Sequence, residues 1–303
     1  MRILLLGADG QLGFELQRAL APLGTVVPAT ESGRLPGDVA CLALDLASEG
    51  AAAAAVAEVG PDVVVNAAAY TAVDRAEDEP ALAQRINAGA VAELAAACAD
   101  RGARLVHFST DYVFAGNRER PYVEGDAPRP LGAYGLSKLE GERAVLGSRA
   151  PHLVFRTAWV YAARGQNFLR TMLRLAGERE ELRVVADQVG SPTPARWLAS
   201  VTALTVGRGD GPSGLWHVVA AGQTSWHGFA EAIVTDAVAF GLLERRPGVV
   251  PIATGDFPAR APRPAHSVLD CSALRRDFGL ALPDWHEGVS EVMAELAASR
   301  IDR

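Results

Sequence analysis

The chain has 303 residues, of which 49% are hydrophobic and 21% charged, a composition typical of a globular protein with a sizeable core. Its net charge of -7 at pH 7, without any basic run, argues against a protein that binds nucleic acid or an acidic membrane surface. No apolar stretch is long enough to span a membrane, and Cys41, Cys98 and Cys271 lie too far apart to suggest a disulfide frame or a zinc site. We therefore expect a cytoplasmic protein with reduced thiols.

The N-terminal stretch predicts a dinucleotide site. Arg2–Leu6 is an apolar run that is too short for a signal peptide and fits a buried parallel strand. The loop Gly7-Ala8-Asp9-Gly10-Gln11-Leu12-Gly13 follows, and an amphipathic helix is expected over Gln11–Leu20. Glycines allow the backbone to approach a pyrophosphate, and the first N–H groups of the helix can bind its oxygens. The G-x-x-G-x-x-G spacing is typical of short-chain dehydrogenase/reductase folds.

The next two predicted strands leave the choice of nicotinamide cofactor open. A strand over Thr25–Ala29 is expected to end near the adenosine ribose, where Glu31 and Arg34 indicate opposite preferences. Ala40–Leu44 is the following strand and ends at Asp45. This carboxylate can either bond the adenine amino group or cap a helix from Ala47 onward.

A fourth predicted strand, Asp62–Asn66, continues into Ala67-Ala68-Ala69-Tyr70-Thr71-Ala72-Val73-Asp74. Small residues at the carboxyl end of a parallel strand leave room for a cofactor. A helix is expected over Pro80–Arg101.

The segment after the next strand carries the catalytic prediction. Arg104–Ser109 is expected to be a strand that places Thr110 at its end, and a loop over 115–132 leads to a helix that contains Tyr134 and Lys138. Residues four apart share one face of a helix. An ammonium next to a phenol is expected to lower the phenol's pKa, so that Tyr134 and Lys138 can form a proton relay for carbonyl chemistry. Alone, the spacing is equally compatible with an exposed amphipathic helix.

Beyond the predicted strand His152–Thr157, the alternation of strands and helices weakens. We expect a fold of the α/β class, a Rossmann-type doubly wound parallel sheet with a smaller C-terminal α/β lobe. Residues 1–160 mainly form the dinucleotide-binding domain, and residues 161–303 mainly form a substrate-binding lobe, some of whose segments return to the first domain. The segment 255–268 contains Arg260 and Arg263 and is either a clamp for a diphosphate or a solvated surface loop.

Eight motifs in this order resemble the dTDP-4-dehydrorhamnose reductases, which belong to the extended short-chain dehydrogenase/reductases. They are G-x-x-G-Q-L-G, N-A-A-A-Y-T-A-V-D, S-T-D-Y-V-F, Y-G-x-S-K-L-x-G-E, R-T-A-W-V-Y, G-x-N-F, D-Q-x-G-x-P-T and R-P-A-x-S-x-L-D. The resemblance extends from Met1 to about Leu296.

The resemblance implies reduction of the 4-keto group of dTDP-4-dehydro-β-L-rhamnose by NADPH or NADH. It implies that Tyr134 donates a proton, that Lys138 tunes Tyr134 and holds the nicotinamide ribose, and that Thr110 bonds the substrate oxygen. The implied cofactor contacts are Gly7, Gly10, Gln11, Leu12, Asp45, Leu46, Ala68, Ala69, Thr71, Tyr134 and Lys138.

The resemblance also implies a nucleotide-sugar site. Its contacts are Val73, Thr110, Tyr112, Trp159, Asn167, Gln188 and Arg263. Some members of the family dimerise around magnesium held by glutamates, and Glu15 and Glu295 match two such positions. Arg196 follows the Pro-Thr motif where a glutamate is needed, which argues against a bound Mg²⁺ and leaves a monomer or a homodimer as the expected state.

Three rival functions follow from the same motifs. A 4,6-dehydratase or epimerase shares the scaffold, but dehydratases carry Thr-Asp-Glu where this chain has Tyr112 after Asp111. A 4-ketoreductase for another nucleotide deoxysugar is barely distinguishable by sequence. A non-catalytic regulatory subunit, similar to that of methionine adenosyltransferase, is the rival from another class.

Overall fold

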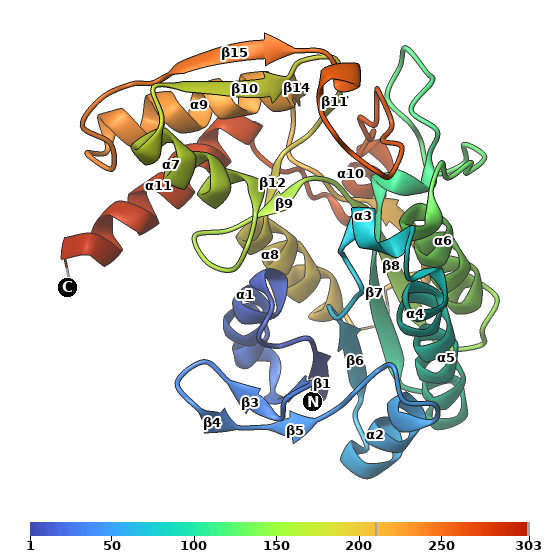
Figure 1. Ribbon diagram of the computed structural model, residues 1–303. Coiled ribbons are helices and arrows are strands. Elements are labelled where there is room, and N and C mark those ends of the chain that lie inside the picture. Colours follow the sequence, from blue (N-terminus) through green and yellow to red (C-terminus); the bar gives the residue numbers. More distant parts are fainter. Residues whose placement is uncertain (210, 302–303) are drawn as a thin grey trace.

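The chain forms a larger and a smaller lobe in a computed structural model that describes residues 1–209 and 211–301. The last two residues of the expected second domain, 302–303, lie outside the described residues. Figure 1 shows the larger lobe around a central sheet and the smaller lobe above one end of that sheet. Within the two described ranges, no helix has both the length and the apolar character needed to cross a bilayer.

The centre of the larger lobe is a parallel sheet of seven strands in the order β13-β8-β7-β6-β1-β2-β5. Every neighbouring pair in this sheet is parallel. The strands are β1 (Arg2–Leu6), β2 (Thr25–Thr30), β5 (Leu42–Ala43), β6 (Val63–Asn66), β7 (Arg104–Thr110), β8 (His152–Thr157) and β13 (Gly214–His217). The predicted α/β doubly wound fold is confirmed.

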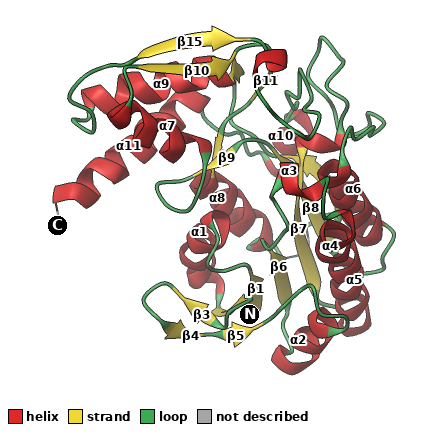
Figure 2. Cartoon of the chain, viewed as in Figure 1, coloured by secondary structure: helices red, strands yellow, loops and turns green. Residues whose placement is uncertain are grey.

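Helices cover both faces of this sheet (Figure 2). Ile3 and Leu5 of β1 pack with α1 (Gln11–Leu20), α8 (Ala195–Val206) and α10 (Ser272–Phe278). Leu4 and Leu6 point to the opposite face, toward α2 (Ala51–Val59) and α5 (Ala90–Arg101). Alternate residues of a strand point to opposite faces, so a run of leucines and isoleucine without polar interruption is what a strand covered on both sides requires.

The smaller lobe has its own apolar core. It is built around Leu169, Phe229, Ile233 and Val289, all of which are fully buried. Its elements are α7 (Phe168–Glu178), β10 (Glu181–Val185), α9 (Trp226–Ala239), β15 (Gly248–Ile252) and α11 (Trp285–Ile301). Strands β10 and β15 form a parallel pair at the outer side of the lobe.

Short paired strands connect the two lobes. They are β9 (Val160–Tyr161) with β12 (Thr193–Pro194), and β11 (Val189–Gly190) with β14 (Thr224–Ser225). After β12 the chain returns to the larger lobe, where α8 packs on α1 and β13 extends the sheet beside β8.

Three expected elements differ from the structure. The strand expected over Ala40–Leu44 is divided into β4 (Val39–Ala40), which pairs with β3 (Arg34–Leu35), and β5 at the sheet edge. The helix expected from Ala47 begins at Ala51. The helix expected over Pro80–Arg101 consists of α4 (Pro80–Gln84), a π-helical segment Arg85–Gly89 and α5, because the chain accommodates one wide turn around Asn87.

Candidate active site

The candidate site lies where the parallel strands end. From β1 the chain continues outward to β2 and β5 on one side of β1. It then crosses to β6, which lies on the other side of β1. Such a reversal of strand order opens a crevice at the carboxyl ends of the strands, which is where α/β proteins bind ligands. Gly7 follows β1 there and packs against Ala68, which follows β6: a Cβ built on Gly7 would lie 2.8 Å from the Ala68 nitrogen.

The glycine loop fits a dinucleotide. Gly7 has φ 70°, and a Cβ on Gly13 would lie only 1.9 Å from the carbonyl oxygen of Gly7, so neither position accepts a side chain. Gly10 is the N-cap of α1, and among the described residues no side chain caps this helix. The first N–H groups of α1 therefore face the crevice without a side-chain acceptor, the arrangement that binds phosphate oxygens.

The predicted catalytic residues come together beside this loop. Tyr134 and Lys138 lie on α6 (Ala133–Leu146), which packs on β7 and β8. The Lys138 Nζ donates a hydrogen bond of 2.7 Å to the carbonyl oxygen of Phe108, and the Thr110 hydroxyl lies near enough to the Tyr134 phenol to lower its pKa. β7 therefore places Thr110 and the Phe108 carbonyl against the face of α6 that carries both Tyr134 and Lys138.

The pKa of Tyr134 differs from the prediction. Burial, with a further contribution from the Asp111 charge, raises the pKa of Tyr134 to about 12, while the nearby Thr110 hydroxyl offsets part of the rise. The expected lowering by Lys138 does not appear, because withdrawal from water disfavours the phenolate more than a nearby ammonium favours it. Tyr134 is thus a neutral phenol at neutral pH and carries the proton that a general acid needs.

Lys138 is only 3% exposed, and burial lowers the pKa of its ammonium to about 8 while the Glu142 carboxylate opposes the change. Glu142 lies one turn further along α6 and forms two hydrogen bonds, of 2.8 and 2.7 Å, with the guanidinium of Arg156 on β8. Their side chains are 1% and 4% exposed. A buried, doubly bonded ion pair of this kind fixes the position of α6 against the sheet.

Two further polar groups hold α6 in place. The buried amide of Asn87 donates to the Ser137 Oγ at 3.0 Å and also bonds the backbone of Tyr70. Glu77, from the end of α3 (Val73–Ala76), accepts a hydrogen bond of 2.8 Å from the backbone nitrogen of Ala133. A carboxylate at this position stabilises the start of the helix that carries Tyr134.

Asp111 is another buried polar residue of the site, and it is hydrogen-bonded to Thr110. It is 1% exposed and follows β7 directly. Its Oδ1 accepts a hydrogen bond of 3.1 Å from Thr110 Oγ1, and its Oδ2 accepts one of 2.5 Å from Ser267 Oγ. Burial raises the pKa of Asp111 to about 6, although these bonds oppose the rise.

Residues 253–268, which we call the strap, cross above Tyr134. The strap is bound to the larger lobe through Asp74, whose carboxylate accepts hydrogen bonds from the Ala261 nitrogen at 3.0 Å and from Arg263 Nη2 at 2.9 Å. Arg260 forms a second, exposed ion pair with Asp78. Through its ion pair with Asp74, Arg263, a predicted substrate ligand, is paired within the protein.

A small cavity of about 10 Å³ remains between the strap and α6. Val73, Tyr112 and Tyr134 line it from the larger lobe, and Ala261, Pro262 and Pro264 line it from the strap. Two predicted substrate residues, Val73 and Tyr112, thus lie beside Tyr134, and a third, Arg263, belongs to the strap that covers them. A cavity of this volume holds about one water molecule and no sugar.

The other predicted substrate residues lie in two separate places. Trp159 has φ 48°, stacks on Trp226 at 3.6 Å between ring centroids and lies against Gly190. Gln188 accepts a hydrogen bond from Trp226 and donates one to Thr254 of the strap. A non-glycine residue in the left-handed region is strained, and such strain is concentrated at functional sites.

Asn167, the remaining predicted substrate residue, lies at the boundary between the two lobes. It caps α7 by accepting a hydrogen bond from the Arg170 nitrogen, and its Nδ2 donates 2.7 Å to Gln11 Oε1. Gln11 in turn donates to the carbonyl oxygen of Gln166. The Gln11–Asn167 bond therefore ties the glycine loop to the smaller lobe.

The residues predicted at the adenosine end of the site have partners within the protein or are exposed. The Asp45 carboxylate closes a local turn by accepting from the Ala47 nitrogen at 2.8 Å and from Ser48 Oγ at 2.9 Å, so it does not cap α2. Leu46 is buried, and its carbonyl oxygen accepts from Arg85. Glu31 and Arg34 are exposed near the end of β2, where Arg34 pairs with Asp38. Ala69 is half-buried and Thr71 exposed beyond the end of β6.

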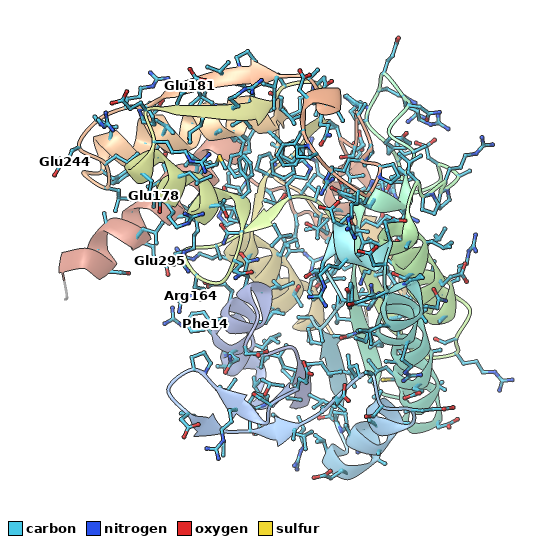
Figure 3. All side chains as sticks on the ribbon, in the orientation of Figure 1. Phe14, Arg164, Glu178, Glu181, Glu244 and Glu295 are labelled. Atoms are coloured by element: carbon cyan, nitrogen blue, oxygen red, sulfur yellow. The ribbon has the colours of Figure 1, made fainter. Side chains whose placement is uncertain are left out.

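The two glutamates matched to a magnesium site are paired with arginines instead. Arg196 pairs with Glu295, and its Nε lies 3.8 Å from Glu15 Oε2, while Arg164 lies 3.1 Å from Glu295. Figure 3 labels Glu295, Arg164 and Phe14, which follow one another across the boundary between the lobes. The described residues contain no cluster of three or more His, Cys, Asp or Glu side chains suited to a metal. These residues do not fit Mg²⁺, because guanidinium groups already neutralise both carboxylates.

Comparison with known proteins places the chain within one family. The family described as RmlD substrate binding domain matches residues 1–298. The dTDP-4-dehydrorhamnose reductase of Burkholderia thailandensis is 50% identical over 98% of this chain and 99% of that protein. A probable dTDP-4,6-dihydroxy-2-methyloxan-3-one 4-ketoreductase of Streptomyces antibioticus is 40% identical over 99% and 97%.

A solved structure shows the same fold with a cofactor. The dTDP-4-dehydrorhamnose reductase of Bacillus anthracis, in complex with NADP, superimposes with a TM-score of 0.87 at 37% identity, covering 97% of this chain and 99% of that one.

Proposed function

Since the chain belongs to the RmlD substrate binding domain family, we propose that it reduces the 4-keto group of dTDP-4-dehydro-β-L-rhamnose to a hydroxyl group, giving dTDP-β-L-rhamnose, with NADPH or NADH as the reductant. The observation that carries this proposal is the meeting of Thr110, Tyr134 and Lys138 at the carboxyl ends of the strands, next to a loop in which Gly7 and Gly13 have no room for a side chain. The similarity to named reductases over nearly the full chain supports it.

In this proposal, the residues of the chain bind the cofactor, orient the substrate and protonate the substrate oxygen. The backbone N–H groups at Gln11 and Leu12 would hold the pyrophosphate of the cofactor, which supplies the hydride, while the N–H of Gly10 bonds the carbonyl oxygen of Gly7 and closes the loop. Tyr134 donates its phenolic proton to the oxygen that becomes the alcohol, and Thr110 holds that oxygen beside Tyr134. Lys138 provides a positive charge that supports the oxygen as it becomes negative.

The sugar nucleotide would lie between the lobes. We place its sugar against Val73 and Tyr112, next to Tyr134, and its nucleoside near Trp159 and Gln188 in the smaller lobe, with Arg263 facing the diphosphate. We assign residues 1–160 mainly to the cofactor domain and 161–303 mainly to the substrate lobe, and we expect turnover without added magnesium.

The reaction can be tested by following NADPH or NADH absorbance with dTDP-4-dehydrorhamnose produced in situ by a dehydratase and an epimerase. We expect decay that stops when the keto sugar is consumed, with dTDP-rhamnose identified by mass spectrometry and NMR. Running both cofactors side by side gives the preference. An absence of decay with both cofactors, from protein that binds them, would contradict the proposal.

A second candidate is reduction of a different dTDP-4-keto deoxysugar. The 40% identity to the Streptomyces antibioticus protein, whose name describes a 4-ketoreductase of another sugar, favours it. A panel of dTDP-4-keto sugars separates the two candidates by kcat/KM. If no keto sugar is reduced and the chain instead co-purifies with a stoichiometric partner, the result favours a non-catalytic regulatory subunit.

A further inference from the structure

The loop 45–50 follows β5 and lies at the carboxyl ends of the parallel strands, at the same edge of the sheet as the glycine loop. A dinucleotide whose pyrophosphate binds at the start of α1 and whose nicotinamide lies near Tyr134 has to place its adenosine on the other side of the glycine loop. β2 and β5 lie on that side of β1, because the sheet order places β6, β7 and β8 on the opposite side. The loop 45–50 is therefore the segment that we expect beside the adenosine.

The peptide bond between Leu46 and Ala47 is held from both of its sides. The carbonyl oxygen of Leu46 accepts a hydrogen bond of 3.2 Å from Nε of Arg85. The N–H of Ala47 donates one of 2.8 Å to Oδ1 of Asp45. The Asp45 carboxylate thus takes its orientation from a peptide that Arg85 holds. Asp45 is exposed, and each of its oxygens accepts one bond from the loop, which leaves acceptor capacity for the amino group of an adenine.

Arg85 also holds the other end of this loop, through Glu93. Its Nη2 donates a hydrogen bond of 2.7 Å to Oε1 of Glu93, and the same oxygen accepts the N–H of Gly50 at 3.1 Å. The side chains of Arg85 and Glu93 are 24% and 19% exposed. Charge-assisted bonds of this kind are stronger than those between neutral groups. One ion pair therefore holds both Leu46 and Gly50, at the two ends of the segment that leads to α2.

The position of the Arg85 guanidinium depends on Gly89. Residues 85–89 form the π-helical turn before α5, and the guanidinium lies against the last of them. A Cβ on Gly89 would lie 2.7 Å from Nη1 and 3.3 Å from Cζ of Arg85. Gly89 has φ -60°, an ordinary helical value, so its backbone does not require glycine. What the missing side chain provides is room for the guanidinium.

We propose that Arg85 is a positioning residue for the adenosine half of the nicotinamide cofactor. It holds the Leu46–Ala47 peptide, and through this peptide the Asp45 carboxylate, in the orientation that meets the adenine. The inference rests on the proposed function, in which the crevice binds NADPH or NADH. Because Arg85 acts through the loop, its replacement should weaken binding of the adenosine half without removing a group that contacts the cofactor.

Arg85→Lys tests the proposal with the positive charge retained. Lysine keeps an ammonium for Glu93 but lacks the second donor of the guanidinium fork, which reaches Leu46. Binding of ADP, which has the adenosine and a diphosphate but no nicotinamide, is measured by isothermal titration calorimetry beside binding of NADPH. We expect both dissociation constants to rise by the same factor, about fivefold, as for the loss of one hydrogen bond. The dissociation constant of dTDP, which we place in the smaller lobe, should not change.

Gly89→Ala displaces the same guanidinium without replacing Arg85. Alanine suits a helical backbone better than glycine, so the Tm should be unchanged or higher, whereas ADP should bind more weakly. A purely structural role for Arg85 would not separate these two results, since affinity would then fall only together with stability. If Arg85→Lys does not fold, the ADP affinity of Gly89→Ala still decides.

Arg101→Lys is the matched control. Arg101 is the last residue of α5, and its guanidinium also bonds backbone carbonyl groups, those of Pro61 at 2.9 Å and Gly60 at 2.7 Å. These two residues precede β6 and so lie at the opposite end of the sheet from the glycine loop. Arg101→Lys should therefore leave the dissociation constant of ADP unchanged.

Three results would overturn the proposal: an unchanged ADP dissociation constant in Arg85→Lys or Gly89→Ala, a weaker binding of NADPH that ADP does not share, or an equal effect in Arg101→Lys. Wild-type protein that binds NADPH but not ADP would overturn it too, because the adenosine half would then contribute no affinity. These titrations need no keto sugar. Wild-type protein that binds neither NADPH nor NADH would instead contradict the proposed function itself.

Discussion

The charged side chains of two regions of the candidate site differ in their exposure to water. One region is the floor, formed by Thr110, Asp111, Lys138 and Glu142, and the other is the strap above it. In the floor, Lys138 is 3% exposed and Glu142 1%, and each has a partner within hydrogen-bonding distance. In the strap, the side chains of Arg260 and its partner Asp78 are 68% and 55% exposed. Buried charges are costly to separate, whereas exposed pairs contribute little and exchange readily with water. The floor is therefore suited to fixing reacting groups, and the strap to opening for a ligand.

Replacement of Lys138 by Met is expected to have the largest effect. It removes the buried ammonium of the floor and should lower kcat by about 10²-fold or more, since positioned proton-transfer groups contribute 10²–10⁴-fold. Leu136→Met is the control, because Leu136 lies on the same helix and is 49% exposed. Steady-state NADPH oxidation measures both. Equal rates in the two variants would mean that the buried charge has no part in the reaction.

The Glu142–Arg156 pair tests whether burial makes the floor rigid. Glu142→Gln leaves the buried Arg156 without a charged partner, and we expect a loss of about 3–5 kcal/mol in the free energy of unfolding measured by urea. Glu140→Gln is the same substitution on the same helix, at an ion pair whose side chains are 61% and 35% exposed, and it should cost less than about 1 kcal/mol. Similar losses in the two variants would remove the distinction between buried and exposed charge.

Asp111 gives the floor a pH dependence of stability. Burial raises the pKa of Asp111 from 3.8 to about 6, so the folded protein takes up this proton more readily than the unfolded chain. The contribution is therefore most favourable below about pH 4, falls by about 3 kcal/mol as the pH rises to about 6, and is constant above that. The difference in unfolding free energy between wild type and Asp111→Asn should follow this curve. A difference that does not change with pH would show that Asp111 titrates as an ordinary carboxyl.

Substitutions in the strap should change the free energy of unfolding least and the affinity for the sugar nucleotide most. The Asp74–Arg263 pair is partly exposed, with side chains 43% and 19% accessible, so Arg263→Ala should cost below about 1 kcal/mol of stability. We expect this variant to raise the KM for the sugar nucleotide by up to about tenfold with kcat nearly unchanged. Arg260→Ala, at the more exposed pair, should change the KM less. A fall in kcat without any change in KM would place Arg263 with the floor.

The sequence predicted the features that depend on residues close together along the chain. The run Arg2–Leu6 followed by glycines identifies β1 and the dinucleotide loop, and the spacing of Tyr134 and Lys138 places both on one helix face. Six strands of the parallel sheet were predicted from the alternation of strands and helices, whereas β13 was not, because the alternation weakens before it. Each of these depends on neighbours within a few residues, which a sequence displays directly.

Features that depend on distant partners were not predicted. Ser267 bonds Asp111 across 156 positions, and Asn167 bonds Gln11 across the same separation. Asp111, Ser267 and Asn87 lie within or beside conspicuous motifs, yet nothing local shows that Asp111 meets Ser267 or that Asn87 meets Ser137 of α6. The predicted lowering of the Tyr134 pKa was wrong for the same reason, because residue spacing contains no information on burial. Glu142 and Arg156 carry one weak signal: Arg156 is a lone charge in an otherwise apolar strand.

The central claim is that the buried floor transfers a proton from Tyr134 while the rest of the site binds. Single-turnover reduction of dTDP-4-dehydrorhamnose by protein preloaded with NADPH tests it most directly, with wild type and Tyr134→Phe measured together. We predict oxidation of the bound NADPH that is slower in Tyr134→Phe by about 10²–10⁴-fold, with the same amount of NADPH bound to both proteins. Equal rates in the two proteins, or loss of NADPH binding with the hydroxyl, would contradict the account.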